Sequence, residues 1–325
     1  MTPALLSSLT IAQFAVVLQP ETELVLPGYK GGAFRGGFGY VFKSIVCPTH
    51  DTDCIHKRLR ERCIYSEVFE TPVPPDSVVM RKYTRAPHPF VLTPPLENRS
   101  RFGAEQELRL ELVLMGQAIP WLAYFICTLE ELGRRGVGLQ RSRYRVMRAE
   151  NMSERNGGSS AAETPVYDGV QRKVIGEPRV IAVDSFTKGP PNPRAVTLRF
   201  LTPLRMVSNG ELASELPFVT LFRNLLRRLA LLAYFHCGQA ADVAAMRELI
   251  QAAESVKVRE SSLRWRDWQR YSTRQQTRMK LGGLEGQITY EGDLAPFAPF
   301  LRAGHLTHAG KGTSFGLGKY ALEEG

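Results

Sequence analysis

Four glycines and two lysines gather in the segment HAGKGTSFGLGKY, which runs from His308 to Tyr320. Glycine tolerates positive φ and lets another backbone approach closely. Exposed main-chain amides beside cations are groups that hold phosphate. The segment therefore predicts an anion-binding loop, whose members are Gly310, Gly312, Gly316, Gly318, Lys311 and Lys319.

A Walker phosphate loop does not fit this segment. That motif needs GxxxxGK followed by serine or threonine. Gly304 lies one residue too far from Gly310, and Gly312 stands where the hydroxyl belongs. The alternative to an anion site is a tight glycine turn that closes a domain.

The most basic stretch of the chain, VKVRESSLRWRDWQRYSTRQQTRMK (256–280), comes shortly before the loop. Its cations are opposed only by Glu260 and Asp267. Alternation with a period of two predicts one strand face that carries Arg264, Arg266, Trp268 and Arg270. Cations beside a stacking ring bind RNA. The alternative is an edge strand whose charges prevent association with other strands.

Composition indicates a folded chain with a polyanionic partner. The 325 residues are 43% hydrophobic and 23% charged, which allows two globular domains. The formal net charge of +10 favours binding to nucleic acid. No stretch reaches the roughly 18 apolar residues that a membrane span needs. Since the start of the chain lacks the basic region of a signal peptide, we expect a cytoplasmic protein that binds no membrane.

Hydrophobic patterning predicts the same order of elements twice. The first half reads as strand, helix, two strands, helix and strand, in segments 9–18, 29–46, 77–92, 107–116, 119–134 and 138–148. The second half repeats this order with an added helix, in segments 194–207, 217–235, 240–254, 257–270, 278–290, 296–303 and 318–322. Two βαββαβ units predict an α+β protein with tandem ferredoxin-like domains and antiparallel sheets.

We assign residues 1–150 to an N-terminal domain and residues 194–325 to a C-terminal domain, whose glycine-rich loop spans 304–318. Residues 151–193 begin with a polar, small-residue stretch, which is typical of a flexible linker or insertion. In the helix expected at 217–235, the apolar stripe predicts that three arginines face away from the core. They are Arg223, Arg227 and Arg228.

A cysteine-bearing insert is expected near residues 47–76. It contains CPTHDTDCIHKRLRERC, in which Cys47, Cys54, His56 and Cys63 are close enough to surround one tetrahedral zinc ion. His50 is a substitute ligand. Because a CxxC spacing is absent, the alternative is three reduced cysteines in a cytosolic protein.

Together these motifs resemble those of the CRISPR-associated endoribonucleases that process precursor CRISPR RNA, members of the RAMP superfamily. The similar segments are GKGTSFGLGKY, GDLAPFAPFLRAG, WRDWQRYSTRQQ and YKGGAFRGGFG. The resemblance implies a tandem ferredoxin-like fold, a glycine loop that contacts CRISPR repeat RNA, and cleavage without a metal or cofactor that leaves a 2′,3′-cyclic phosphate. It also implies a purely structural role for any zinc, although Lys57 stands where similar proteins carry a fourth cysteine.

Metal-free cleavage needs a base for the 2′-hydroxyl and cations for the phosphate. We assign His308 or His305 as the base and Lys311 as the cation, because these residues flank the start of the glycine loop. The alternative is that both histidines make only structural hydrogen bonds.

The resembling family commonly carries its catalytic histidine around the first helix, but residues 29–46 contain none. Candidates there are Tyr29, Lys30, Tyr40 and Lys43, with Arg35 as a phosphate ligand. The competing function is therefore an inactive RAMP subunit that holds guide RNA together with other CRISPR-associated subunits.

Overall fold

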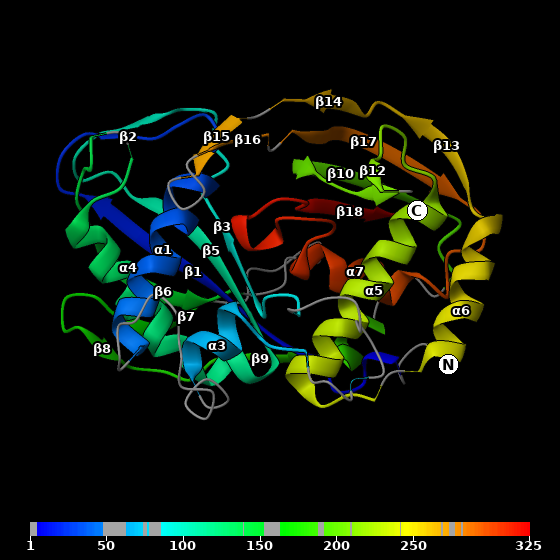
Figure 1. Ribbon diagram of the computed structural model, residues 1–325, viewed down its shortest axis with the longest axis horizontal. Coiled ribbons are helices and arrows are strands. Elements are labelled where there is room, and N and C mark those ends of the chain that lie inside the picture. Colours follow the sequence, from blue (N-terminus) through cyan, green and yellow to red (C-terminus); the bar gives the residue numbers. More distant parts are fainter. Residues whose placement is uncertain are drawn as a thin grey trace. The chain divides into compact units, whose positions relative to one another are not determined.

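The computed structural model describes most of the chain. The described residues are 5–47, 63–73, 77, 86–138, 140–152, 163–187, 192–208, 210–240, 242–267, 269–272, 277–280 and 282–325. Two compact units form (Figure 1). We call Ile11–Val73 with His88–Val180 the N-terminal unit, and Met1–Thr10 with Pro74–Pro87 and Ile181–Gly325 the C-terminal unit.

The N-terminal unit contains the predicted βαββαβ order. Its main elements are β1 (Thr10–Pro20), α1 (Gly31–Val46), β3 (Phe90–Thr93), β5 (Leu108–Met115), α4 (Leu122–Arg135) and β6 (Tyr144–Asn151). The strands pair antiparallel in the order β3-β5-β1-β6, as in a ferredoxin-like sheet. Shorter elements are β2 (Leu24–Val25), β4 (Arg101–Phe102), α3 (Ile64–Phe69) and the 3₁₀ helix η2 (Gly116–Trp121).

Aromatic side chains fill the core between the two helices and the sheet of the N-terminal unit. Phe38 and Phe42, one turn apart on α1, lie 5.5 and 5.2 Å from Phe125 of α4 between ring centroids. Phe90 of β3 lies 5.4 Å from Phe125. This packing explains why a helix with so many glycines forms, because tertiary burial outweighs their low helix propensity.

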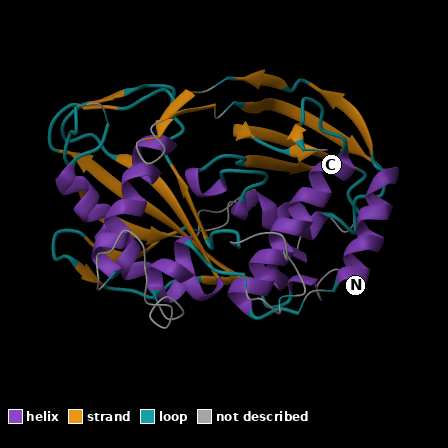
Figure 2. Ribbon diagram, viewed as in Figure 1, coloured by secondary structure: helices purple, strands orange, loops and turns teal. Residues whose placement is uncertain are grey.

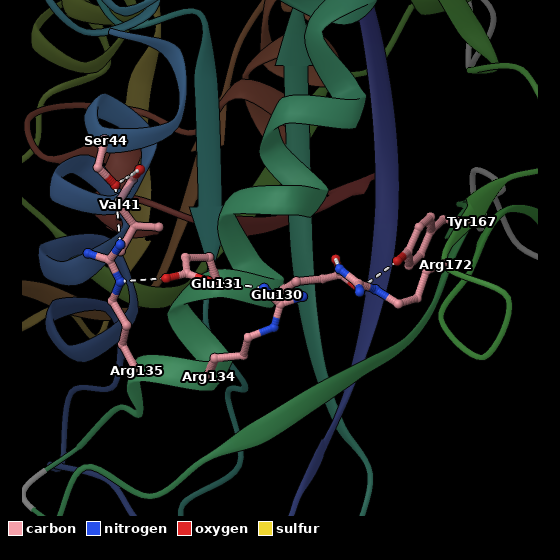
Figure 3. A network of polar contacts seen from close by, with 8 residues as sticks. All are labelled: Val41, Ser44, Glu130, Glu131, Arg134, Arg135, Tyr167 and Arg172. Carbon is pink, nitrogen blue, oxygen red and sulfur yellow. Dashed lines mark hydrogen bonds and ion pairs between the residues drawn. The ribbon is translucent and has the colours of Figure 1, made fainter. Parts of the chain in front are cut away.

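Part of the segment 151–193, which was predicted to be a flexible linker or an insertion, forms strands. Strand β7 (Thr164–Asp168) pairs with β6, and β8 (Lys173–Val174) pairs with β7, so both extend the N-terminal sheet. Val166 and Tyr167 are buried. Figure 3 shows why the segment is held: Tyr167 donates to Glu130 of α4 at 2.6 Å, and Arg172 pairs with the same carboxylate at 3.1 Å. Strand β9 (Val180–Ala182) and the 3₁₀ helix η3 (Val183–Thr187) follow.

The C-terminal unit repeats the fold. Its main elements are β10 (Ala195–Leu204), α5 (Phe218–Cys237), α6 (Val243–Ala252), β13 (Lys257–Ser261), β14 (Arg264–Arg266), β17 (Gly283–Glu291), α7 (Ala298–Thr307) and β18 (Tyr320–Glu324). The antiparallel order is β13-β17-β10-β18, with β14 also paired to β17. Helices α5 and α7 pack together (Figure 2), through Phe222, Phe297 and Phe300. The tandem ferredoxin-like prediction is confirmed.

The two segments predicted to form one hairpin, 257–270 and 278–290, contribute strands to two different sheets. Strands β13 and β14 lie along β17, whereas β15 (Gln269–Ser272) pairs with β16 (Thr277–Lys280) in a separate small sheet. The remaining elements are β11 (Val207–Ser208), β12 (Glu211–Leu212) and the 3₁₀ helices η4 (Ala253–Ser255) and η5 (Thr313–Phe315). None of the helices described is both long enough and apolar enough to span a membrane.

Candidate nucleic-acid interface

The glycine-rich loop connects α7 to β18 and adopts the predicted left-handed conformations. The φ angles of Gly310, Gly312, Gly316 and Gly318 are 78°, 78°, 82° and 71°. A Cβ atom at Gly310 would lie 2.4 Å from the carbonyl oxygen of Arg205, a contact too close for any side chain. Glycine is required here by both conformation and space.

Backbone hydrogen bonds fix the two ends of the loop. Ala309 donates to the Gly318 carbonyl at 3.0 Å, and Gly318 donates to the Pro203 carbonyl at 3.0 Å. Among the residues that the structure describes, the amides of Gly312, Thr313 and Ser314 have no backbone or side-chain acceptor. These successive donors follow the exposed Lys311; Gly312 is half-buried, and Thr313 and Ser314 are buried. Successive amides beside a cation are the groups that bind an anion.

Arg205 connects the loop to the basic strands. Its carbonyl oxygen accepts from the Lys311 amide at 2.7 Å, and its Nη1 donates to the Gly282 carbonyl at 3.1 Å. Gly282 directly precedes β17, whose first residue pairs with Arg266 of β14. The loop and the β14–β17 pair are therefore neighbours. Sequence analysis missed Arg205, although a cation at the end of an apolar strand was an available signal.

The predicted cationic strand face is only partly present. Arg264 and Arg266 are exposed on β14, and Arg266 forms an ion pair with Glu285 at 3.0 Å. Arg270 belongs to β15, in the separate sheet, so it does not continue the face of β14. Trp268 lies outside the described residues. The exposed indole that the structure describes in this region belongs to Trp265.

His308 lies inside the loop. Its side chain is 1% exposed, and its Nδ1 donates to the Leu317 carbonyl at 3.2 Å. Burial lowers the pKa of His308 far below its ordinary value. Its backbone has φ of 62° and ψ of 162°, a conformation that residues other than glycine adopt only when the surrounding structure holds them there. These contacts favour the structural alternative for His308 over a role as base.

His305 lies one helical turn earlier, in α7, and is half-buried. Its Nδ1 lies 2.6 Å from the Tyr320 carbonyl oxygen. Because a carbonyl only accepts, Nδ1 carries the proton and the lone pair of the neutral ring lies on Nε2. Of the two predicted histidines, only His305 is less than fully buried, so it is the better candidate for the base.

Arg228 corrects a second prediction, because it faces the interior. The side chain is 9% exposed, and burial lowers the pKa of its guanidinium to about 10. Its Nη2 and Nε donate to the Thr307 and His308 carbonyls at 3.0 and 3.2 Å. Carbonyls at the end of a helix have no partner within it. Arg228 therefore supplies donors for the end of α7, where the glycine-rich loop begins.

Arg35 also differs from its predicted role. It is 9% exposed, and its guanidinium carbon lies 4.6 Å from the ring centroid of Phe69 and 5.2 Å from that of Phe90. It packs in the N-terminal core as a cation over aromatic rings instead of presenting a phosphate ligand. Nearby Lys30 is likewise buried, with its Nζ donating to the Glu97 carbonyl at 2.5 Å.

The zinc prediction stays a prediction. Cys54 and His56 lie outside the described residues. Cys47 is buried and Cys63 is half-buried, and neither forms a disulfide with a described cysteine. Within the described residues, no group of three metal-binding side chains is assembled.

Acidification is expected to destabilise the folded chain through His308. Because its folded pKa lies below the unfolded value of about 6.5, the unfolded chain binds more protons as the pH falls through that value. Between pH 7 and pH 5 this histidine contributes a loss of up to about 2 kcal/mol. Urea unfolding of the parent and of His308→Gly checks this, since glycine tolerates the positive φ. If the free energy of unfolding fell equally with pH in both proteins, the loss would not come from His308.

Comparisons with known proteins match both halves of the chain. Residues 198–320 match a family model described as CRISPR-associated endoribonuclease Cas6, and residues 9–179 match one described as an N-terminal domain, AF_1859_N. A Cas6 product complex is similar in fold, with a TM-score of 0.57 at 18% identity over 96% of this chain and 99% of the other. A chain of a partial Cas6-RT-Cas1–Cas2 complex is also similar in fold, with a TM-score of 0.57 at 11% identity over 98% of this chain and 46% of the other.

A curated relative from Archaeoglobus fulgidus, described as an uncharacterized protein, is 28% identical over 144 residues, or 44% of this chain. The match spans 45% of that relative, less than half of its length.

Proposed function

Because residues 198–320 match the family model of CRISPR-associated endoribonuclease Cas6 and the whole chain shares the fold of solved Cas6 proteins, we propose that it binds CRISPR repeat RNA and cleaves precursor CRISPR RNA. One observation carries the proposal: Arg205 accepts from the Lys311 amide of the loop and donates to the Gly282 carbonyl, which directly precedes β17, the strand paired with β14. In this proposal the loop amides and Lys311 bind one phosphate of the RNA, and Arg264 and Arg266 bind phosphates further along the same RNA strand.

The proposed reaction needs no metal. Nε2 of His305 takes the proton of a 2′-hydroxyl, whose oxygen forms a bond to the adjacent phosphorus. The bond from phosphorus to the 5′-oxygen breaks, and that oxygen takes a proton from solvent or a neighbouring acid. The products are a 2′,3′-cyclic phosphate and a 5′-hydroxyl. Lys311 stabilises the charge that develops on the phosphate oxygens.

The test uses the repeat RNA encoded beside the gene, incubated with protein in EDTA. We expect a single cut with a cyclic phosphate end, slowed about 100-fold in His305→Gln with RNA binding retained. Lys311→Ala should weaken binding and reduce the slope of log affinity against log salt by about 1.

The outcomes separate the candidate functions. Cleavage that is unchanged in His305→Gln would reject the assigned base. Tight binding without cleavage by the parent protein would favour the inactive RNA-holding subunit. Binding that does not respond to salt would reject the interface itself.

Other CRISPR-associated subunits are proposed as protein partners, since a similar fold occurs within a Cas6-RT-Cas1–Cas2 complex. Co-purification with the proteins encoded beside the gene, before and after ribonuclease treatment, tests whether an association depends on RNA.

A further inference from the structure

Trp265 is an exposed aromatic residue within a cluster of cations. It is the middle residue of β14, between Arg264 and Arg266, and it is 43% exposed. Alternation along the strand places its indole on the face opposite the two arginines. Its strand partner is Leu284, which is buried. An exposed aromatic ring beside cations is the arrangement on which unpaired bases stack.

Two neighbours hold the indole in one orientation. Its Nε1 donates to Asp267 Oδ1 at 2.8 Å. Gly282 leaves room beside the ring, because a Cβ there would lie 3.1 Å from Cζ2 of Trp265 and 2.7 Å from the Asp267 oxygen. The ring therefore lies against bare backbone, and part of its surface stays open to solvent.

The same glycine links the indole to the glycine-rich loop. The Gly282 carbonyl accepts from Arg205, and the Arg205 carbonyl accepts from the Lys311 amide. Two residues, Gly282 and Arg205, thus separate Trp265 from the loop. An aromatic face and an amide-rich loop connected in this way offer one RNA strand contacts for both of its parts, the bases and the phosphates.

We propose that Trp265 is a stacking platform for an unpaired base of the RNA whose backbone contacts the glycine-rich loop, with Asp267 as its positioning residue. The inference rests on the proposed function and names how one nucleotide is held. A base fits the observations better than an apolar side chain of a partner protein, because Arg264 and Arg266 flank Trp265 along β14, and their charges favour a polyanion.

The affinity contributed by ionic contacts falls with salt concentration, whereas the affinity contributed by stacking does not. The salt dependence of RNA affinity therefore distinguishes the two kinds of contact. Trp265→Ala should weaken the affinity for single-stranded repeat RNA by about 10- to 100-fold, with the salt slope unchanged. Trp265→Phe should restore most of the loss, since it keeps an aromatic face. Arg266→Ala is the matched ionic control and should reduce the slope by about 1.

A second readout locates the stacked base. Repeat RNAs with 2-aminopurine at successive unpaired positions should show one position whose fluorescence is quenched by the parent and by Trp265→Phe but not by Trp265→Ala. Thermal unfolding confirms that each variant is folded.

Parent-like affinity and quenching in Trp265→Ala would overturn the platform and leave the proposed function standing. A reduced salt slope in Trp265→Ala would overturn it in favour of an ionic role. A parent protein without RNA affinity would overturn both.

Discussion

Gly318→Ala is expected to lower the free energy of unfolding by about 4–5 kcal/mol and to remove RNA binding. Gly318 has φ of 71°, which costs a residue with a side chain about 1–2 kcal/mol. In addition, its Cβ would lie 1.8 Å from the Ala309 carbonyl oxygen. That oxygen is backbone at the opposite end of the loop, so it moves only if the loop opens, which adds overpacking of about 3 kcal/mol.

Gly238 is the matched control for this substitution. It ends α5 with φ of 69°, but a Cβ there would meet nothing within 4 Å. Gly238→Ala should therefore cost only the conformational strain of about 1–2 kcal/mol and leave RNA affinity unchanged. Urea unfolding and RNA titration measure both effects. Equal destabilisation of the two variants, or parent-like RNA affinity in Gly318→Ala, would contradict the claim that closure of the loop shapes the interface.

The repeated fold could be predicted because its signal is periodic and local. Strand β1 and helices α1 and α5 follow runs of apolar residues whose spacing identifies each element. Strands β7 and β8 were missed because they are short and follow a polar segment. They are held by Tyr167 and Arg172 contacting Glu130, which is 37 and 42 positions away in the sequence. Sequence periodicity carries no information about such partners.

The glycines of the candidate site were predictable for a related reason. Tolerance of positive φ is a property of glycine itself, so a cluster of glycines indicates such a backbone without knowledge of the fold. The polar side chains were not predictable in this way. His308, Arg228 and Arg35 resemble surface residues in sequence, and only the tertiary positions of carbonyl groups and aromatic rings reveal that they are buried.

The burial of two of these residues has one structural consequence. His308 donates to the Leu317 carbonyl near the end of the glycine-rich loop, and Arg228 donates to the His308 carbonyl at its beginning. Side chains that were predicted to serve in catalysis and to face solvent instead make hydrogen bonds to the backbone at the two ends of the glycine-rich loop. The shape of the loop therefore depends on α5, where Arg228 lies.

Arg228→Met tests this dependence. Methionine matches the apolar stem of arginine in length but lacks the guanidinium, so the donors to the Thr307 and His308 carbonyls are removed. These carbonyl oxygens are then left buried without these partners. We expect a loss of about 3–4 kcal/mol in the free energy of unfolding, at about 1.5–2 kcal/mol for each carbonyl. RNA affinity should fall even where the variant is fully folded, because the loop loses its anchor on α5.

Arg227→Met controls for the loss of one positive charge on the same helix. Arg227 is exposed, so its replacement should change the free energy of unfolding by no more than about 0.5 kcal/mol. If both variants lost stability and RNA affinity equally, the effect would come from charge and not from the hydrogen bonds of Arg228. If Arg228→Met alone loses affinity, while its salt slope matches that of the parent, then Arg228 acts by holding the loop and makes no phosphate contact of its own.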